Sequence, residues 1–180
     1  MTREPASQYV HELMDSYPDF PSPGILFRDL TPVFAHAGAF RAVVDALLEG
    51  DPHDTGAAPV AIAGVEARGF LLAAAGAYSA GVGVIAVRKA GKLPGTVLAE
   101  GYALEYGEAE LELHADRFER GSRVLLVDDL LATGGTLAAA ASLVERAGYV
   151  VAGIRVVLEL EGLGGRKKLA GHRVRSIARI

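Results

Sequence analysis

The sequence of 180 residues predicts one α/β domain, built on a parallel sheet with flanking helices. Short runs of apolar and β-branched residues alternate with longer segments that have helical periodicity. Strands that are apolar on both faces are typical of a sheet covered by helices on both sides. Hydrophobic residues make up 51% of the chain and charged residues 22%, which is the balance of a folded globular protein.

The N-terminal segment is expected to hold two helices separated by an irregular stretch. Apolar side chains recur on one face of a helix from Ser7 to Tyr17. The next stretch, PDFPSPGILFRDLTPVF, places four prolines and a glycine among apolar residues, which indicates an ordered loop. A second helix is expected over Ala39–Glu49.

The rest of the chain alternates strands and helices without a linker or an internal repeat, so residues 1–180 are expected to form a single domain. The expected strands are Pro59–Gly64, Gly83–Val87, Val97–Leu104, Ala109–His114, Arg123–Val127, Val150–Leu158 and Arg173–Ile177, the third and fourth of them paired with each other. The expected helices are Gly69–Ala80, Gly135–Arg146 and a short one near Gly165–Ala170.

One uncharged stretch of 19 residues, Gly69 to Val87, has nearly the length of a membrane span. It contains four glycines, and Ser79 to Gly81 resemble a helix end that is followed by β-branched residues. A buried helix, turn and strand is therefore expected there, and no membrane partner.

Composition excludes several classes of function. The formal net charge of −4 and a pI near 5.7 argue against a nucleic-acid partner, which normally meets a basic surface. Without cysteine there are no disulfides, thiolate zinc sites or thiol nucleophiles, and the five histidines lack ligand-like spacing. The sequence GVGVIA fits a dinucleotide fingerprint in letters only, because it leads into a strand instead of opening a helix. The charged N-terminus is no secretory signal, and a cytoplasmic location is expected.

The strongest functional signal is the segment Arg123–Thr136, RVLLVDDLLATGGT. A buried strand is expected to end at two adjacent carboxylates, Asp128 and Asp129, and a short loop then opens a helix. Free N–H groups at a helix start can bind phosphate, and glycines let the backbone come close. Carboxylates repel phosphate, but they accept hydrogen bonds from sugar hydroxyls or bind hydrated Mg²⁺. The pattern predicts a ribose 5-phosphate site; the alternative is a plain strand end with a threonine N-cap.

This segment resembles the phosphoribosyl diphosphate signature of the type I phosphoribosyltransferases. Other segments resemble the adenine phosphoribosyltransferase family in order and spacing: FPSPGILFRDLTPVF, ARGF, RKAGKLPG, LEYG and VVLELEGLGGRKKL. The resemblance extends from Phe20 to Leu169, and FRDLTPVF and LEYG narrow it to the adenine-specific family. It implies a type I phosphoribosyltransferase-like core, a small N-terminal hood (residues 1–35) and a mobile loop.

The resemblance also assigns a site for phosphoribosyl diphosphate. Its implied members are Arg68, Arg88, Lys92, Asp128, Asp129, Ala132, Thr133, Gly134, Gly135 and Thr136. The loop Ala132–Thr136 would bind the 5-phosphate, the aspartates the ribose hydroxyls, and the three cations the diphosphate. Each cation taken alone is equally an exposed loop charge. Two departures from the family are Glu66-Ala67, ahead of the arginine of ARGF, and Ala90, where a basic residue can occur.

The catalytic candidates are Glu105, Asp128 and Asp129. Glu105 lies in LEYG, which the family places over the reacting centre, where a carboxylate could take or steer the N9 proton. A surface glutamate on a strand is the alternative. The negative charge of the two aspartates would favour a positive, oxocarbenium-like sugar in the transition state.

Adenine recognition, by the same resemblance, falls to Leu26, Phe27 and Arg28 of the hood and to Leu130 on the other side of the base. Leu26 would act through its backbone. Phe27 is equally suited to packing in the core, because an aromatic residue between prolines is more often a packing residue.

The activity that the resemblance implies is transfer of the phosphoribosyl group from its diphosphate to adenine, giving AMP and pyrophosphate in purine salvage. Mg²⁺ would be held mainly through the diphosphate, with no direct protein ligand assigned, and the enzyme would be a homodimer. Two alternatives remain: the same transferase acting on a 6-oxopurine, and a non-catalytic regulator that senses phosphoribosyl diphosphate. Such a regulator should carry a DNA-binding segment and a basic face.

Overall fold

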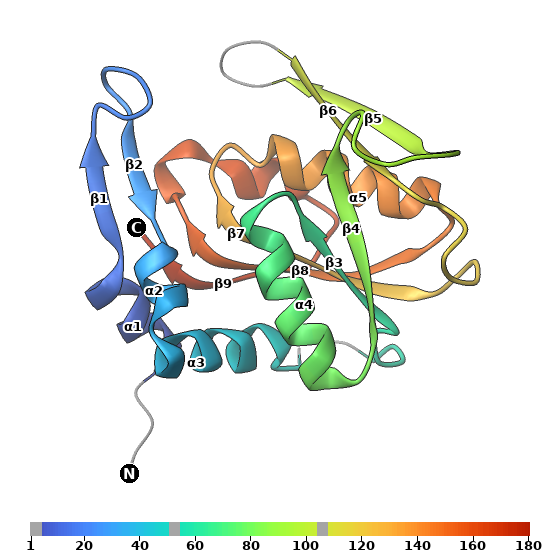
Figure 1. Cartoon of the computed structure of the whole chain (residues 1–180), viewed down its shortest axis with the longest axis horizontal. Helices are drawn as coiled ribbons and strands as arrows, with labels where there is room; N and C mark the ends of the chain where they lie inside the picture. The colour runs from blue at the N-terminus through green and yellow to red at the C-terminus, as the bar shows by residue number, and fades with distance from the viewer. Residues whose placement is uncertain (1–4, 51–54, 104–107) are drawn as a thin grey trace.

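The computed structural model describes residues 5–50, 55–103 and 108–180, and its centre is a seven-stranded sheet (Figure 1). The strands lie in the order β5-β6-β4-β3-β7-β8-β9. Five of them are mutually parallel: β3 (Ala61–Val65), β4 (Gly83–Lys89), β7 (Arg123–Leu131), β8 (Val150–Glu159) and β9 (Val174–Arg179). The antiparallel pair β5 (Leu98–Ala103) and β6 (Glu108–Leu113) extends the sheet along the edge of β4. The predicted parallel core and the predicted strand pair are both confirmed, and together they make the sheet mixed.

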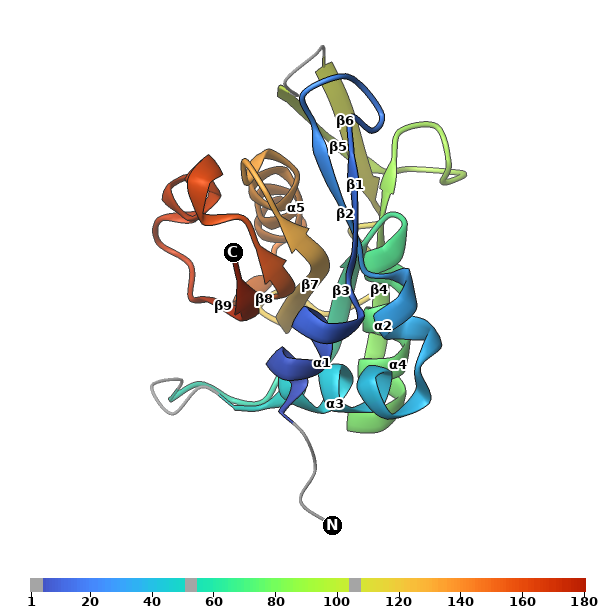
Figure 2. The ribbon, with the colours of Figure 1, turned by 90° about the vertical axis from the view of Figure 1, so that its left-hand side faces the viewer.

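Helices cover both faces of the sheet, as the apolar strands predicted (Figure 2). On one face, α5 (Gly135–Arg146) packs with the residues of β3 that point to that side, such as Ala63. On the other face lie α1 (Ala6–Leu13), α3 (Ala37–Leu48) and α4 (Arg68–Ala80), which bury Ile62 from the same strand. Successive strand residues point to opposite faces, so one apolar strand supplies both cores.

The N-terminal segment differs from its prediction. Helix α1 ends at Leu13, and β1 (Asp15–Pro18) then pairs antiparallel with β2 (Leu26–Asp29). Met14, at the C-terminal end of α1, is already extended, with ψ 127°, and the proline at position 18 disfavours helical conformation at Tyr17 as well. The stretch expected to be irregular therefore contains β2 and also the short helix α2 (Thr31–Ala35), which has a proline in its first turn.

Strand β7 is longer than predicted, because it continues past Val127 through both aspartates to Leu131. Its neighbour β8 keeps pairing with it over this stretch, with Asp128 opposite Val156 and Leu131 opposite Glu159. The chain after β8 forms two 3₁₀ helices, η1 (Glu161–Leu163) and η2 (Gly165–Leu169), where a short helix was expected. Within the described ranges, no helix is long and apolar enough to cross a membrane.

Candidate active site

A cleft of about 490 Å³ lies where β3 and β7 lead into their helices. The β1–β2 and β5–β6 hairpins both extend toward the top of Figure 1, on either side of the loop that follows β7. The lining residues come from the β3–α4 connection and the start of α4, from β4, β5 and β6, and from the end of β7 through its loop into α5: Glu66, Ala67, Arg68, Lys89, Tyr102, Ala109, Asp128, Asp129, Leu130, Leu131, Ala132, Thr133, Gly134, Gly135, Thr136 and Leu137. This is the strand edge at which parallel α/β sheets bind ligands.

One wall of the cleft is the loop between β7 and α5. Gly134 adopts φ +79°, a left-handed conformation that favours glycine, and α5 begins at the next residue. No side chain of the described residues caps the first N–H groups of α5. Uncapped N–H groups and the helix dipole attract an anion, and Thr133 and Thr136 add hydroxyl groups. The loop can therefore hold a phosphate, as its sequence predicts.

A second glycine turn supports this loop from behind. Gly165, at the start of η2, faces Ala132 and Gly134 across a main-chain contact too close for any side chain. A Cβ on Gly165 would lie 2.9 Å from the nitrogen of Gly134 and nearer still to the Ala132 carbonyl oxygen. The following residue, Arg166, bonds the buried carboxylate of Glu159 through Nε at 2.9 Å and through its NH2 group at 2.5 Å. The loop's shape therefore depends on a segment about 30 residues further along the chain.

The two adjacent aspartates form the floor of the cleft. Asp128 and Asp129 are 9% and 6% exposed, and the main-chain N–H of Asp129 donates to Oδ1 of Asp128 at 2.9 Å. Oδ2 of Asp129 lies 2.7 Å from Nε of Arg68. That oxygen is itself buried, so Arg68 is the partner of its charge within the described residues.

The environment of the aspartates disfavours two full charges. Burial, followed by the neighbouring charge of Asp129, raises the pKa of Asp128 well above its ordinary value of 3.8. Burial also raises the pKa of Asp129, although the guanidinium of Arg68 opposes the shift. A ligand that donates hydrogen bonds, or brings a cation, would stabilise the ionised pair.

Helix α4 approaches the aspartates closely because its first turn contains a glycine. A Cβ on Gly69 would lie 2.9 Å from Oδ1 of Asp128, and one on Gly64 would also collide with the backbone of Gly69. The close approach brings Arg68, the first residue of α4, over Asp129. The glycine of the ARGF motif therefore has a packing role beside the arginine that precedes it.

Arg68 also links the cleft to the N-terminal hairpin. Its NH1 group lies 3.7 Å from Oδ1 of Asp29, and its guanidinium carbon lies 5.6 Å from the centre of the Phe27 ring. Phe27 packs edge-on against Phe20 at 5.1 Å. A neighbouring cavity of about 470 Å³ is lined by Tyr17, Pro18, Asp19, Phe20, Phe27 and Asp29. Its aromatic walls suit a flat ring.

The end of β4 and the turn after it carry the remaining predicted cations. Nε of Arg88 lies 3.3 Å from Oε2 of Glu66, which also accepts the main-chain N–H of Lys89 at 3.0 Å. Lys92 lies further along the turn, where the carboxylate of Glu112 accepts its main-chain N–H. The cleft is lined here by Lys89, and by neither Arg88 nor Lys92.

The predicted residues therefore fall into four groups. The cleft brings together Arg68, Asp128, Asp129, Leu130, Ala132, Thr133, Gly134, Gly135 and Thr136. Phe27 lines the neighbouring cavity, whereas Leu26, Arg28, Arg88 and Lys92 line neither; Arg28 bonds Ser16 on the opposite face of the hairpin at 2.6 Å. Glu105 lies outside the described residues.

Sequence reasoning missed several residues of this region. Glu66 was noted only as a departure from a motif, yet it lines the cleft and holds the start of the turn. Lys89 directly follows Arg88, which was predicted to bind the diphosphate. Because successive side chains of a strand point to opposite sides, this alternation could have indicated that only one of the two faces the cleft. Nothing in the sequence pointed to Tyr102 of β5, because a strand at a sheet edge contacts the cleft only through the tertiary fold.

Comparison with known proteins assigns the family. Residues 34–176 match the phosphoribosyl transferase domain, so the fold and the site define a phosphoribosyltransferase. The adenine phosphoribosyltransferase of Clavibacter michiganensis is 66% identical over 178 residues, which cover 98% of each chain. The chain belongs to the adenine phosphoribosyltransferase family.

Solved structures of the family have the same fold. The adenine phosphoribosyltransferase of Thermoanaerobacter pseudethanolicus superposes with a TM-score of 0.89 at 45% identity, over 96% of this chain and 99% of the other. The Saccharomyces cerevisiae enzyme gives a TM-score of 0.90 at 39% identity, over 96% and 98% of the two chains. That structure was solved in complex with adenine and D-2,5-dideoxy-2,5-imino-altritol 1,6-bisphosphate.

Proposed function

We propose that this protein transfers the 5-phosphoribosyl group from its 1-diphosphate to N9 of adenine, giving AMP and pyrophosphate. One observation carries the proposal: a main-chain phosphate loop and the carboxylate pair Asp128 and Asp129 line one cleft. A terminal phosphate beside a sugar diol matches that pair of features. The yeast relative, which binds adenine and a bisphosphate, supports the choice of substrates.

In the reaction, the bond from C1 of the ribose to the diphosphate oxygen breaks, and its electron pair leaves with pyrophosphate. A new bond forms between C1 and N9 of adenine, and N9 loses its proton. The loop Ala132–Thr136 would hold the 5-phosphate, while Asp128 and Asp129 would accept hydrogen bonds from the ribose hydroxyls. Their negative charge, fixed in a buried site, would stabilise the positive charge that develops on the sugar.

The leaving group needs positive charge and the base needs a proton acceptor. Arg68, Arg88 and Lys92 would meet the diphosphate as it departs; the lining of the cleft adds Lys89 as a fourth cation. Glu105 would take or steer the N9 proton, in keeping with its place in the LEYG motif.

Adenine would bind between the hood and the β7–α5 loop. Phe27 would contact the face of the ring, because it lines an aromatic cavity beside Arg68. The main chain of Leu26 would contribute polar contacts, with Arg28 beside it in β2, and Leu130 would close the other side. We assign residues 1–35 to this hood and treat residues 1–180 as a single catalytic domain.

Mg²⁺ is the metal expected to accompany a diphosphate substrate. Among the described residues no group of three His, Cys, Asp or Glu side chains could hold a metal alone. The two cleft aspartates offer hard oxygen ligands, and Mg²⁺ typically combines one or two carboxylates with substrate phosphates and water. Asp128 and Asp129 would therefore contact a hydrated ion carried by the diphosphate. When bound, Mg²⁺ would neutralise charge on the leaving group.

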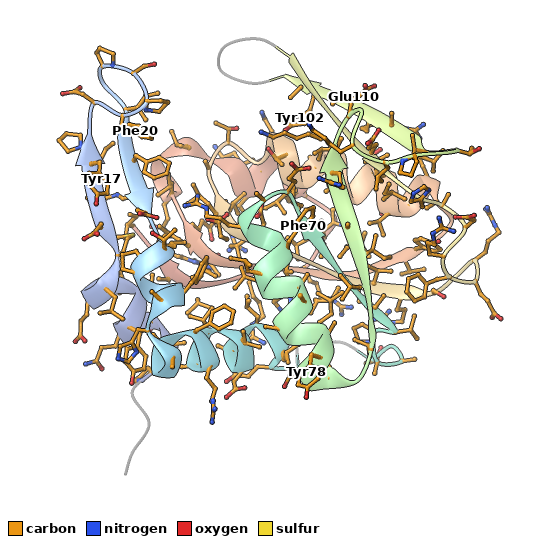
Figure 3. The ribbon with its side chains drawn as sticks, in the orientation of Figure 1. Tyr17, Phe20, Phe70, Tyr78, Tyr102 and Glu110 are labelled. Atoms are coloured by element: carbon orange, nitrogen blue, oxygen red, sulfur yellow. The ribbon has the colours of Figure 1, made fainter. Side chains whose placement is uncertain are left out.

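We also place the enzyme in the cytoplasm as a homodimer. An apolar face of α4 and β4 supports the dimer, with Leu71, Tyr78 and Val84 exposed by 54%, 93% and 49%. Tyr78 projects away from the body of the protein near the end of α4 (Figure 3). Light scattering should give twice the chain mass, and Tyr78→Glu should shift it toward the monomer; a monomeric wild-type protein would exclude the dimer.

The decisive assay mixes the protein with adenine, phosphoribosyl diphosphate and Mg²⁺ and follows AMP and pyrophosphate by chromatography. Hypoxanthine and guanine serve as parallel substrates. AMP formed from adenine alone is the expected result. Preference for a 6-oxopurine would reassign the base, and tight phosphoribosyl diphosphate binding without any product would favour the sensing regulator.

A further inference from the structure

Glu112, in β6, is a buried carboxylate to which the reaction gives no role. It is 4% exposed, although it shares its face of the strand with the exposed Glu110, and the residues that alternate with them, Leu111 and Leu113, point into the core. Its burial therefore comes from the turn that packs over it, between β4 and β5.

The carboxylate bonds the main chain of that turn. Oε1 accepts the N–H groups of Lys92 and Leu93, both at 2.6 Å, and Oε2 accepts the N–H of Gly91 at 3.0 Å. Three consecutive N–H groups thus converge on one side chain, as they do in main-chain anion sites. Glu112 is held by backbone donors, so it shapes the turn without pairing its charge with the ammonium of Lys92.

Other contacts tie the turn to the same strands. The N–H of Ala90 donates to the Glu110 carbonyl oxygen at 3.0 Å, and NH1 of Arg88 donates to the Lys92 carbonyl oxygen at 3.3 Å. Gly91 adopts φ +77°, which favours glycine and lets the chain reverse direction. Residues 88–93 therefore carry three of the proposed diphosphate-binding cations, Arg88, Lys89 and Lys92, and Glu112 bonds the main chain between them.

The hydrogen bonds from the turn to Glu112 are expected to be strong. A buried carboxylate is costly unless donors satisfy it, and hydrogen bonds to a charged acceptor are about twice as strong as neutral ones. Burial alone raises the pKa of Glu112, but the N–H groups of Leu93, Gly91 and Lys92 outweigh it and leave the pKa below its ordinary value. Glu112 is therefore ionised near neutral pH, and its carboxylate can accept all three N–H groups of the turn.

We propose that Glu112 is a positioning residue, whose carboxylate fixes the 88–93 segment, with its cations Arg88, Lys89 and Lys92, at the edge of the cleft where the diphosphate would bind. This inference rests on the proposed function, because it takes those cations to bind pyrophosphate. It predicts a defect confined to ligands that carry a diphosphate. AMP has the ribose and the 5-phosphate but no diphosphate, so its affinity should not depend on Glu112.

The test compares Glu112→Gln with the control Glu110→Gln, which makes the same change at an exposed position on the same face of β6. Calorimetry measures binding of Mg²⁺-pyrophosphate and of AMP, and kinetics give KM and kcat. With Glu112→Gln, the Kd of pyrophosphate and the KM of phosphoribosyl diphosphate should rise about tenfold, the scale of one lost charge-assisted hydrogen bond. The Kd of AMP should stay within about twofold of wild type for both variants.

The outcomes separate this inference from the function on which it rests. Unchanged pyrophosphate binding in Glu112→Gln, or equal weakening of AMP and pyrophosphate, would overturn the positioning role while leaving wild-type turnover intact. Absence of adenine turnover in the wild type would instead refute the proposed function. If Glu112→Gln does not fold, amide hydrogen exchange in the wild type decides: the inference requires protected N–H groups at Gly91, Lys92 and Leu93, and rapid exchange there would refute it.

Discussion

Substituting alanine for Gly165 tests whether the phosphate loop depends on the glycine turn behind it. The added Cβ would lie 2.9 Å from the nitrogen of Gly134, whereas ordinary contact begins at 3.4 Å, and it would press harder on the Ala132 carbonyl oxygen. The two backbones must therefore separate by at least 0.5 Å. Displacement of a binding group by about 1 Å can cost 100-fold in rate, so about a tenfold rise in the KM of phosphoribosyl diphosphate is expected.

The assay pairs steady-state kinetics with binding of AMP and of pyrophosphate. AMP binding should weaken with Gly165→Ala, because the 5-phosphate meets the loop, and pyrophosphate binding should not change. Thermal unfolding should show a loss of about 1–3 kcal/mol from overpacking. Gly162→Ala is the matched control, since a Cβ there meets nothing within 4 Å. A KM and an AMP Kd within about twofold of wild type in Gly165→Ala would refute the reasoning.

Three further predictions concern carboxylates. Asp129→Asn should lower kcat about 100-fold with an unchanged melting temperature, and wild-type turnover would contradict its role. Glu105→Gln should lower kcat more than it raises KM; the reverse pattern would indicate a binding role. Glu159→Gln should destabilise the fold near pH 7 by about 1–2 kcal/mol, a modest cost because Arg166 is partly exposed and screened. Bonding to Arg166 lowers the pKa of Glu159, so its contribution is complete above the ordinary value of 4.5 and is lost as pH falls through the lowered pKa. Urea unfolding measures the free energy of unfolding of wild type and Glu159→Gln. The difference between the two should disappear as the pH falls below 4.5, and a difference independent of pH would disprove the stabilising role of the Glu159 carboxylate.

Features that depend on neighbouring residues in the chain were predictable. The β7–α5 connection could be anticipated because a buried strand, a carboxylate pair, a glycine turn and a helix follow one another within 24 residues, from Arg123 to Arg146. Helix α5 has the predicted bounds, and the strand pair β5–β6 was visible from alternation. Each of these patterns is local, and a local pattern predicts the folded structure when tertiary contacts favour the same conformation.

Features that depend on distant segments could not be predicted. The β1–β2 hairpin has no two-residue glycine turn to mark it, and its strands read as a helix end and a loop. Glu112 looks like any alternating charge in a strand, and only the turn packed on it shows that it is buried. Gly165 appears as one of a glycine pair, and its contact with Gly134 exists only once β8 has brought both together.

The contact between Gly165 and Gly134 has a consequence for synthesis of the protein on the ribosome. A chain that has emerged only as far as Leu160 already contains β7, α5 and β8, but it lacks the glycine turn on which the phosphate loop rests. Domains emerge from their N-terminus, so the residues that shape this loop leave the exit tunnel after β7, α5 and β8. The nascent chain can therefore pair β3 to β8 before the support of its phosphate loop has been made, and only β9 of the described sheet follows that support.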